Sequence, residues 1–242
     1  MEYYEYYLMG IILLPAIIFS IYAQIKVDSA YKKYLTVKTQ NGVPASQVAK
    51  QMLQKKDIFD VVVTKVSGTL TDYYSDKDKV VALSQDIYDS DSVSAVGIAM
   101  HEVGHAIQYA DGYKMVHVRN IMIKVSNISS VVLWPLVIIG LILNLAVVGS
   151  GVVGSVIAWS GIGFFAIAVI LNLITLPVEF DASNRAKKLM EQENLLTVDE
   201  RVGATKVLNS AALTYVAALM VSVMNLVRFI LVVLINSSRR RD

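Results

Sequence analysis

The chain has 242 residues, of which 55% are hydrophobic and only 17% are charged, whereas soluble domains carry about 25% charged residues. Its 22 lysines and arginines nearly balance 20 aspartates and glutamates, so it lacks the strong basic charge typical of nucleic-acid-binding proteins. It contains no cysteine, which excludes disulfides, thiolate nucleophiles and thiolate metal ligands. A metal site in this chain must therefore use nitrogen and oxygen ligands.

The first uncharged segment covers residues 6–25 and is long enough to predict a transmembrane helix. The residues before it include Glu2 and Glu5, whereas a cleaved signal peptide begins with basic residues. We therefore interpret residues 1–25 as an uncleaved N-terminal membrane anchor.

Residues 26–120 predict a cytoplasmic portion with a small β-hairpin or sheet. The β-branched residues at 58–66 predict one strand, and the polar residues at 75–78 predict a turn that leads into a returning strand at 80–83. The returning strand comprises Val80, Val81, Ala82 and Leu83.

A helix that is capped by Asp91 or Ser92 follows, and it contains the sequence HEVGH at residues 101–105. Because His101 and His105 are four residues apart, both side chains project from the same helical face. This pair can hold one zinc ion, so the motif predicts a zinc site on the helix.

Glu102 lies between these histidines, where its carboxylate can face the open coordination position of the zinc. There it can accept a proton from the attacking water and pass it to a leaving amine. A structural zinc site has no need of this acid, and an exposed polar helix face is the simpler alternative. A non-catalytic, zinc-dependent membrane scaffold or sensor is a third interpretation, because the sequence does not by itself show catalysis.

The longest uncharged run covers 54 residues and lies within 121–178. This length suffices for two crossings of a ~30 Å hydrocarbon core. We expect a transmembrane hairpin with helices at about 125–147 and 152–177, joined by a turn at the Gly- and Ser-rich residues 148–151.

The third zinc ligand has four candidates, of which Glu179 is favoured over Asp111, His117 and Asp181. We expect Pro177 to start a new helix that presents Glu179 to the histidines. Small side chains on the same helix face would let it approach closely: Ala182, Ser183 and Ala186.

The remaining segments are a third-ligand helix with further cytoplasmic helices at 179–210, and a C-terminal hydrophobic helix with a basic tail at 211–242. Lysines and arginines flank the first three spans in a way that places 26–120 and 179–206 in the cytoplasm. We expect 211–235 to cross the membrane, although a re-entrant or surface-lying segment remains open. The expected fold is thus α+β and mainly α, a polytopic membrane protein with three to four transmembrane helices.

Taken together, these features resemble the YugP-like membrane zinc metallopeptidases of bacteria, a group related to the gluzincins of the HtpX and CAAX-prenyl-protease type. The resemblance covers nearly the whole chain and rests on HEVGH together with these segments: 68–74, 83–84, 176–183 and 211–215. It implies one zinc per chain, held by His101, His105 and Glu179, with Glu102 as general base. It also implies a site that faces the cytoplasm at the surface of the bacterial plasma membrane.

The sequence departs from the wider group at Ser183, where that group usually places an aspartate that orients the first histidine. Asp181, two residues after Glu179, is another candidate for this supporting role. The candidates for stabilising the transition state are Tyr73, His117, Arg185 and Tyr215, and Arg185 is favoured because it lies on the expected helix of Glu179.

The function expected from these observations is a membrane-embedded zinc endopeptidase that acts on membrane or membrane-proximal polypeptides. In many zinc peptidases an edge strand just before the metal-binding helix pairs with an extended peptide. We therefore expect the strand at 80–83 to hold the substrate backbone. The expected partners are a polypeptide substrate and the lipid bilayer, without nucleic acid.

The alternative within the same chemistry is a site-2-type intramembrane protease, whose zinc helix lies inside the bilayer. The acidic residues at 86–91 argue against it, because they border the HEVGH helix.

Overall fold

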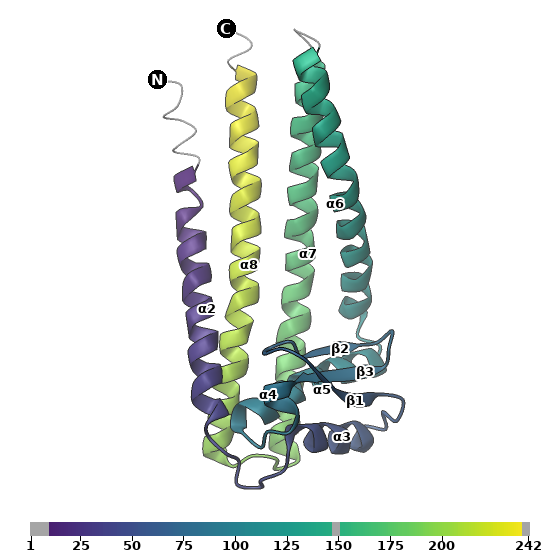
Figure 1. The fold of residues 1–242 in the computed structure, drawn as a ribbon, viewed down its shortest axis with the longest axis vertical. Coiled ribbons are helices and arrows are strands. Elements are labelled where there is room, and N and C mark those ends of the chain that lie inside the picture. The colour runs from purple at the N-terminus through teal and green to yellow at the C-terminus, as the bar shows by residue number, and fades with distance from the viewer. Residues whose placement is uncertain (1–9, 147–150, 239–242) are drawn as a thin grey trace. The chain divides into compact units, whose positions relative to one another are not determined.

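The computed structural model describes residues 10–146 and 151–238, which form a mainly helical α+β protein with one small sheet (Figure 1). This architecture confirms that the fold is α+β and mainly α. The helices are α2 (Leu14–Leu35), α3 (Ala45–Lys55), α4 (Gln85–Tyr88), α5 (Val93–Ala110), α6 (Lys114–Ala146), α7 (Gly151–Gln192) and α8 (Val198–Ser238). The strands are β1 (Val62–Val66), β2 (Tyr73–Ser75) and β3 (Val80–Ser84).

The chain divides into two compact units. One unit, called here the sheet unit, consists of Tyr22–Val116 and Leu176–Tyr215 and contains the whole sheet. The other consists of the described residues within these segments: Met1–Ile21, His117–Thr175 and Val216–Asp242. Helices α7 and α8 each contribute residues to both units.

The three-stranded sheet has the order β1-β3-β2, with β3 in the centre. Strand β2 pairs with β3 in the antiparallel sense, so the predicted hairpin is present, with Tyr73 opposite Ala82. Strand β1 instead runs parallel to β3, with Val62 opposite Val80.

This strand order corrects one prediction. Residues Val80 to Leu83 were expected to form an edge strand that pairs with substrate, but they lie in the central strand β3. The backbone groups on both sides of β3 already bond to β1 and β2, so no row of free donors and acceptors remains for a peptide. The hairpin pattern could not show this, because β1 pairs with the side of β3 that faces away from β2, and β2 lies between them in the sequence.

The core of the sheet unit forms where α5 packs against α3 and the sheet. Helix α3 turns an apolar stripe to this core, whose members are Val48, Met52 and Leu53, all at most 6% exposed. Helix α5 is buried over most of its length and contributes Val96, Met100 and Val103. The HEVGH sequence therefore lies on a helix that the core fixes in place.

Helix α7 runs without interruption from Gly151 to Gln192 and includes Pro177. The expectation that Pro177 starts a new helix was therefore wrong. A proline removes one backbone hydrogen bond, but its φ angle is helical, so a long helix can continue through it. As a result, Glu179 lies on the same helix as the apolar residues before it.

Two helices of the described chain are long and apolar enough to cross a membrane: Trp159–Gln192 within α7 and Val198–Leu231 within α8. Helix α8 passes Arg228 without a break. The expected spans at 6–25 and 125–147 extend into parts of the chain outside the described residues, as does the expected turn at 148–151, and they stay predictions.

Candidate metal centre

Helix α5 begins with a side-chain cap and carries both histidines on one face. The Ser92 hydroxyl accepts a hydrogen bond of 3.2 Å from the backbone N–H of Ala95, which confirms the predicted cap. The ring centroids of His101 and His105 lie 4.7 Å apart. Both rings are thus held side by side, as the spacing of four residues predicts.

Helix α7 brings Glu179 against these two rings. Its Oε2 atom lies 3.3 Å from His101 Nε2 and 3.5 Å from His105 Nε2. The potential ligand atoms of the three residues all lie within 4.8 Å of one another, and they form a possible metal site in the described part of the chain. The Glu179 side chain is only 3% exposed, so the group is largely shielded from water.

The other candidates for the third ligand have different partners. Asp111 forms an ion pair with the Arg185 guanidinium, and its side chain is 57% exposed. Asp181 accepts a hydrogen bond of 2.6 Å from Arg185 Nε. Neither belongs to the group that could hold a metal ion, and nor does His117. The structure therefore brings Glu179 to the histidines and directs Asp111 and Asp181 elsewhere.

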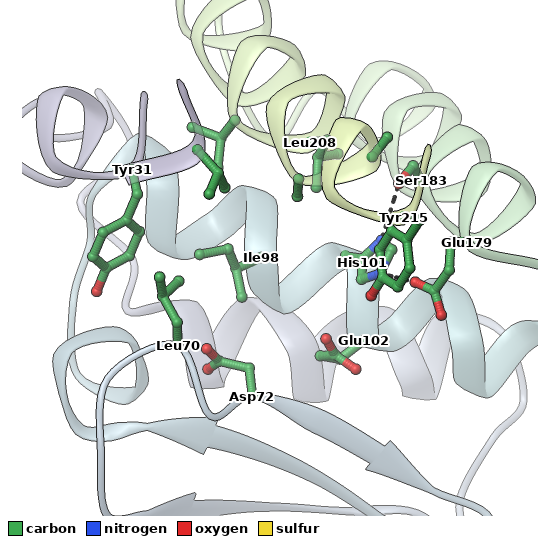
Figure 2. A pocket seen from close by; sticks show the side chains of 14 residues that line it. Tyr31, Leu70, Asp72, Ile98, His101, Glu102, Glu179, Ser183, Leu208 and Tyr215 are labelled. Atoms are coloured by element: carbon green, nitrogen blue, oxygen red, sulfur yellow. Dashed lines mark hydrogen bonds and ion pairs between the residues drawn. The ribbon is translucent and has the colours of Figure 1, made fainter. Parts of the chain in front are cut away.

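The outer nitrogen of each histidine is engaged by a protein oxygen. His101 Nδ1 lies 3.1 Å from the Ser183 hydroxyl, and His105 Nδ1 lies 2.9 Å from Gln108 Oε1 (Figure 2 shows the first pair). An amide oxygen only accepts, so His105 must carry its proton on Nδ1. The neutral form of His105 then keeps the lone pair of Nε2 for a metal ion, as metal binding requires.

Gln108 belongs to a longer chain of polar contacts behind His105. Its amide Nε2 donates to the carbonyl oxygen of Val178 and to Asp181 Oδ2, both at 2.8 Å. Arg185 bonds to Asp181 in turn. Asp181 and Arg185 therefore support the position of His105 through Gln108. Sequence reasoning missed Gln108, although it lies three residues after His105 on the same helix face.

Glu102 is buried at 7% exposure and lines the same cavity as His101 and Glu179. Burial raises the pKa of Glu102. His101 and His105, when protonated, oppose this effect through their positive charge. A carboxyl group with a raised pKa beside a metal site is well placed to take up a proton.

Of the four candidates for transition-state stabilisation, Tyr215 lies in this cavity (Figure 2). His101 and Glu179 line the same cavity. Tyr73 is on the edge strand β2 with 47% of its surface exposed, and neither Tyr73 nor Arg185 is among the described residues that line the cavity. His117 falls in the other compact unit.

The donor set fits zinc. Ligand atoms bound at about 2.0–2.1 Å to a tetrahedral zinc ion lie about 3.3 Å from one another. The distances from Glu179 Oε2 to the two histidine nitrogens, 3.3 and 3.5 Å, agree with this spacing. Two imidazoles and one carboxylate are also a ligand set that zinc uses in catalytic sites, where a fourth position stays open.

Comparison with known proteins identifies the class. A family model described as "Putative neutral zinc metallopeptidase" matches residues 9–234. The match covers most of the chain, so the chain belongs to this family, and the possible metal site at His101, His105 and Glu179 agrees with it. A Bacillus subtilis (strain 168) protein named "Putative membrane protease YugP" is 40% identical over 216 residues, 89% of this chain and 92% of that protein. No solved structure shows significant similarity. These matches confirm the resemblance recognised in the sequence.

Proposed function

We propose that the chain is a membrane-embedded zinc endopeptidase that hydrolyses peptide bonds of membrane or membrane-proximal polypeptides. The observation that supports this proposal best is the position of Glu102, a buried acid in the same cavity as the His101 and Glu179 side chains. A metal site that only stabilises the fold, or a scaffold that only binds zinc, has no use for this acid.

Bound at His101, His105 and Glu179, zinc would polarise the substrate carbonyl and lower the pKa of water. Glu102 accepts a proton from the attacking water and delivers it to the nitrogen of the scissile bond. The C–N bond then breaks, and one water molecule is consumed as a carboxyl group and an amine form. The Tyr215 hydroxyl donates a hydrogen bond to the carbonyl oxygen as negative charge develops there.

We further propose a multi-pass protein of the bacterial plasma membrane with three to four spans and a sheet unit that faces the cytoplasm. The two long apolar segments in α7 and α8 support membrane insertion. The basic residues that follow the first predicted span support the orientation, because such residues favour the cytoplasmic side: Lys26, Lys32, Lys33 and Lys38.

The test compares purified protein with the Glu102→Gln variant, using Glu191→Gln as a control because the Glu191 side chain is 71% exposed. Wild type and both variants are expected to contain about one zinc ion per chain. Glu102→Gln should lower kcat for unfolded peptides by about 100-fold or more, because a positioned general base contributes this much. The control should retain activity.

Protein that binds no zinc, and that gains no peptidase activity when zinc is added, would contradict the proposal. A cellular function that survives Glu102→Gln would instead favour the scaffold or sensor, because that role needs the metal site but not the base.

A further inference from the structure

The cavity at the metal centre extends well beyond the catalytic residues. It has a volume of about 150 Å³, roughly that of an engineered cavity that holds one benzene molecule, so it admits a single side chain. Figure 2 shows Tyr31, Leu70 and Asp72 at the end away from Glu179. Apolar side chains line the stretch between, among them Ile98 and Leu208.

Asp72 places a carboxylate without a cationic partner in this distal end of the cavity. Its Oδ1 atom accepts hydrogen bonds from Ser84, at 2.7 Å from the backbone N–H and 3.1 Å from the hydroxyl. No lysine, arginine or histidine of the described chain forms an ion pair with Asp72. Among the described residues that line the cavity, His101 is the basic residue. Burial raises the pKa of Asp72, because its charge is partly removed from water. Asp72 is half-buried, and a carboxylate that is partly removed from water gains from a cationic partner.

Tyr31 adds a second polar group without a partner. It is only 3% exposed, and its hydroxyl has no hydrogen-bond partner among the described residues. The residue is held in place from the other side, because the Ser94 hydroxyl donates to its backbone carbonyl at 2.9 Å. Burial, together with the negative charges of Asp86 and Asp72, raises the pKa of Tyr31 to about 12. A buried hydroxyl close to two carboxylates is therefore available to accept a hydrogen bond from a cation.

We propose that this end of the cavity is a specificity subsite for a cationic side chain, lysine or arginine, of a polypeptide bound at the metal centre. Asp72 compensates the positive charge, Tyr31 accepts a hydrogen bond from it, and Leu70 and Ile98 contact the aliphatic stem. The inference rests on the proposed peptidase function, because this subsite would bind the side chain of the substrate residue next to the scissile bond.

The test uses zinc-loaded full-length protein and unfolded peptides that are acetylated, amidated and identical except at one position, which is lysine, norleucine or glutamate. Mass spectrometry maps the cleaved bonds. Lysine next to the scissile bond should raise kcat/KM about 10- to 100-fold over norleucine, the range expected for a hydrogen-bonded charge. Glutamate should be disfavoured.

Two variants connect this preference to the subsite. Asp72→Asn keeps an oxygen that can accept from Ser84 and should reduce the lysine preference to a few-fold, mainly through KM. Tyr31→Phe should weaken it less, because the carboxylate remains. Asp60→Asn is the control, since it removes the same charge from a side chain that is 64% exposed and outside the cavity. Thermal unfolding of each variant checks that it is folded.

Cleavage without a preference for lysine or arginine, or a preference that survives Asp72→Asn, would overturn the inference. So would a preference seen only with unblocked peptides, because the amine bound would then be the substrate's N-terminus. If no peptide is cleaved, the proposed function fails instead. Binding of labelled peptides to the Glu102→Gln variant then decides the subsite: equal affinity for lysine and norleucine peptides would overturn it, and tighter binding of lysine peptides would support it.

Discussion

Gly104 on α5 lies directly against the backbone of Ala182 on α7: a methyl group on Gly104 would come within 2.5 Å of the Ala182 carbonyl oxygen. Gly104 is the residue before His105, and Ala182 is three residues after Glu179. The close approach of these two backbones thus lies beside the ligand group. It explains why a glycine is needed at this point of a well-packed helix, where alanine is otherwise favoured.

Gly104→Ala is expected to separate the two helices and move Glu179 away from the histidines. Overpacking at a backbone contact costs about 1–3 kcal/mol, and the shift should also weaken zinc binding. Thermal unfolding and zinc content measure the two effects. Gly163→Ala is the matched control, because a methyl group there meets no atom within 4 Å. Normal zinc content in Gly104→Ala would show that the approach is not required.

Gln108→Leu tests the contact behind His105. The variant removes the oxygen that accepts from His105 Nδ1, so a buried N–H loses its partner and the ring is no longer held in one orientation. Loss of such a supporting contact lowers metal affinity by about 10- to 100-fold. Competition with a zinc chelator measures this change. Gln54→Leu is the control, because Gln54 is exposed on α3. Unchanged affinity would mean that Gln108 only fills space.

Removal of the metal should destabilise the protein, because zinc binds only where the fold brings Glu179 to the two histidines. We expect chelation to lower the midpoint of thermal unfolding and to abolish peptide cleavage, and added zinc to restore both. Glu179→Gln should unfold at the same temperature with and without chelator. A response in this variant as large as in the wild type would place the metal elsewhere.

The orientation of the sheet unit can be tested by labelling, since the chain has no cysteine. Asp60→Cys introduces a thiol at an exposed position of that unit. In intact cells it should resist a membrane-impermeant maleimide and react only after permeabilisation. Gly149→Cys, in the turn expected between the two central spans, should react in intact cells. The opposite pattern would invert the proposed topology.

Several features could be predicted from local sequence. The position of Ser92 before the apolar helix predicted its cap, and the spacing of four residues predicted that His101 and His105 share a face. The polar turn after β2 predicted the β2–β3 hairpin. Each of these depends on backbone geometry within a few residues, and no distant segment is needed to produce it.

The remaining features depend on how distant segments pack. Strand β1 takes a parallel place beside β3, so the predicted substrate strand is central, and helix α7 continues through Pro177. Gln108 connects His105 to Asp181 because α5 and α7 meet at Gly104. Asp72 and Tyr31 share one cavity although they are 41 residues apart in sequence.

The sequence by itself determined the chemistry of this protein: nitrogen and oxygen ligands, an acid between two histidines, and long apolar segments. The tertiary structure decided which distant carboxylate meets the histidines, which groups hold their outer nitrogens, and what lines the cavity beside them. The physical reason is that periodicity fixes the direction of side chains along one helix, whereas contacts between helices depend on side-chain volume. Here α5 and α7 can approach because Gly104 has no side chain.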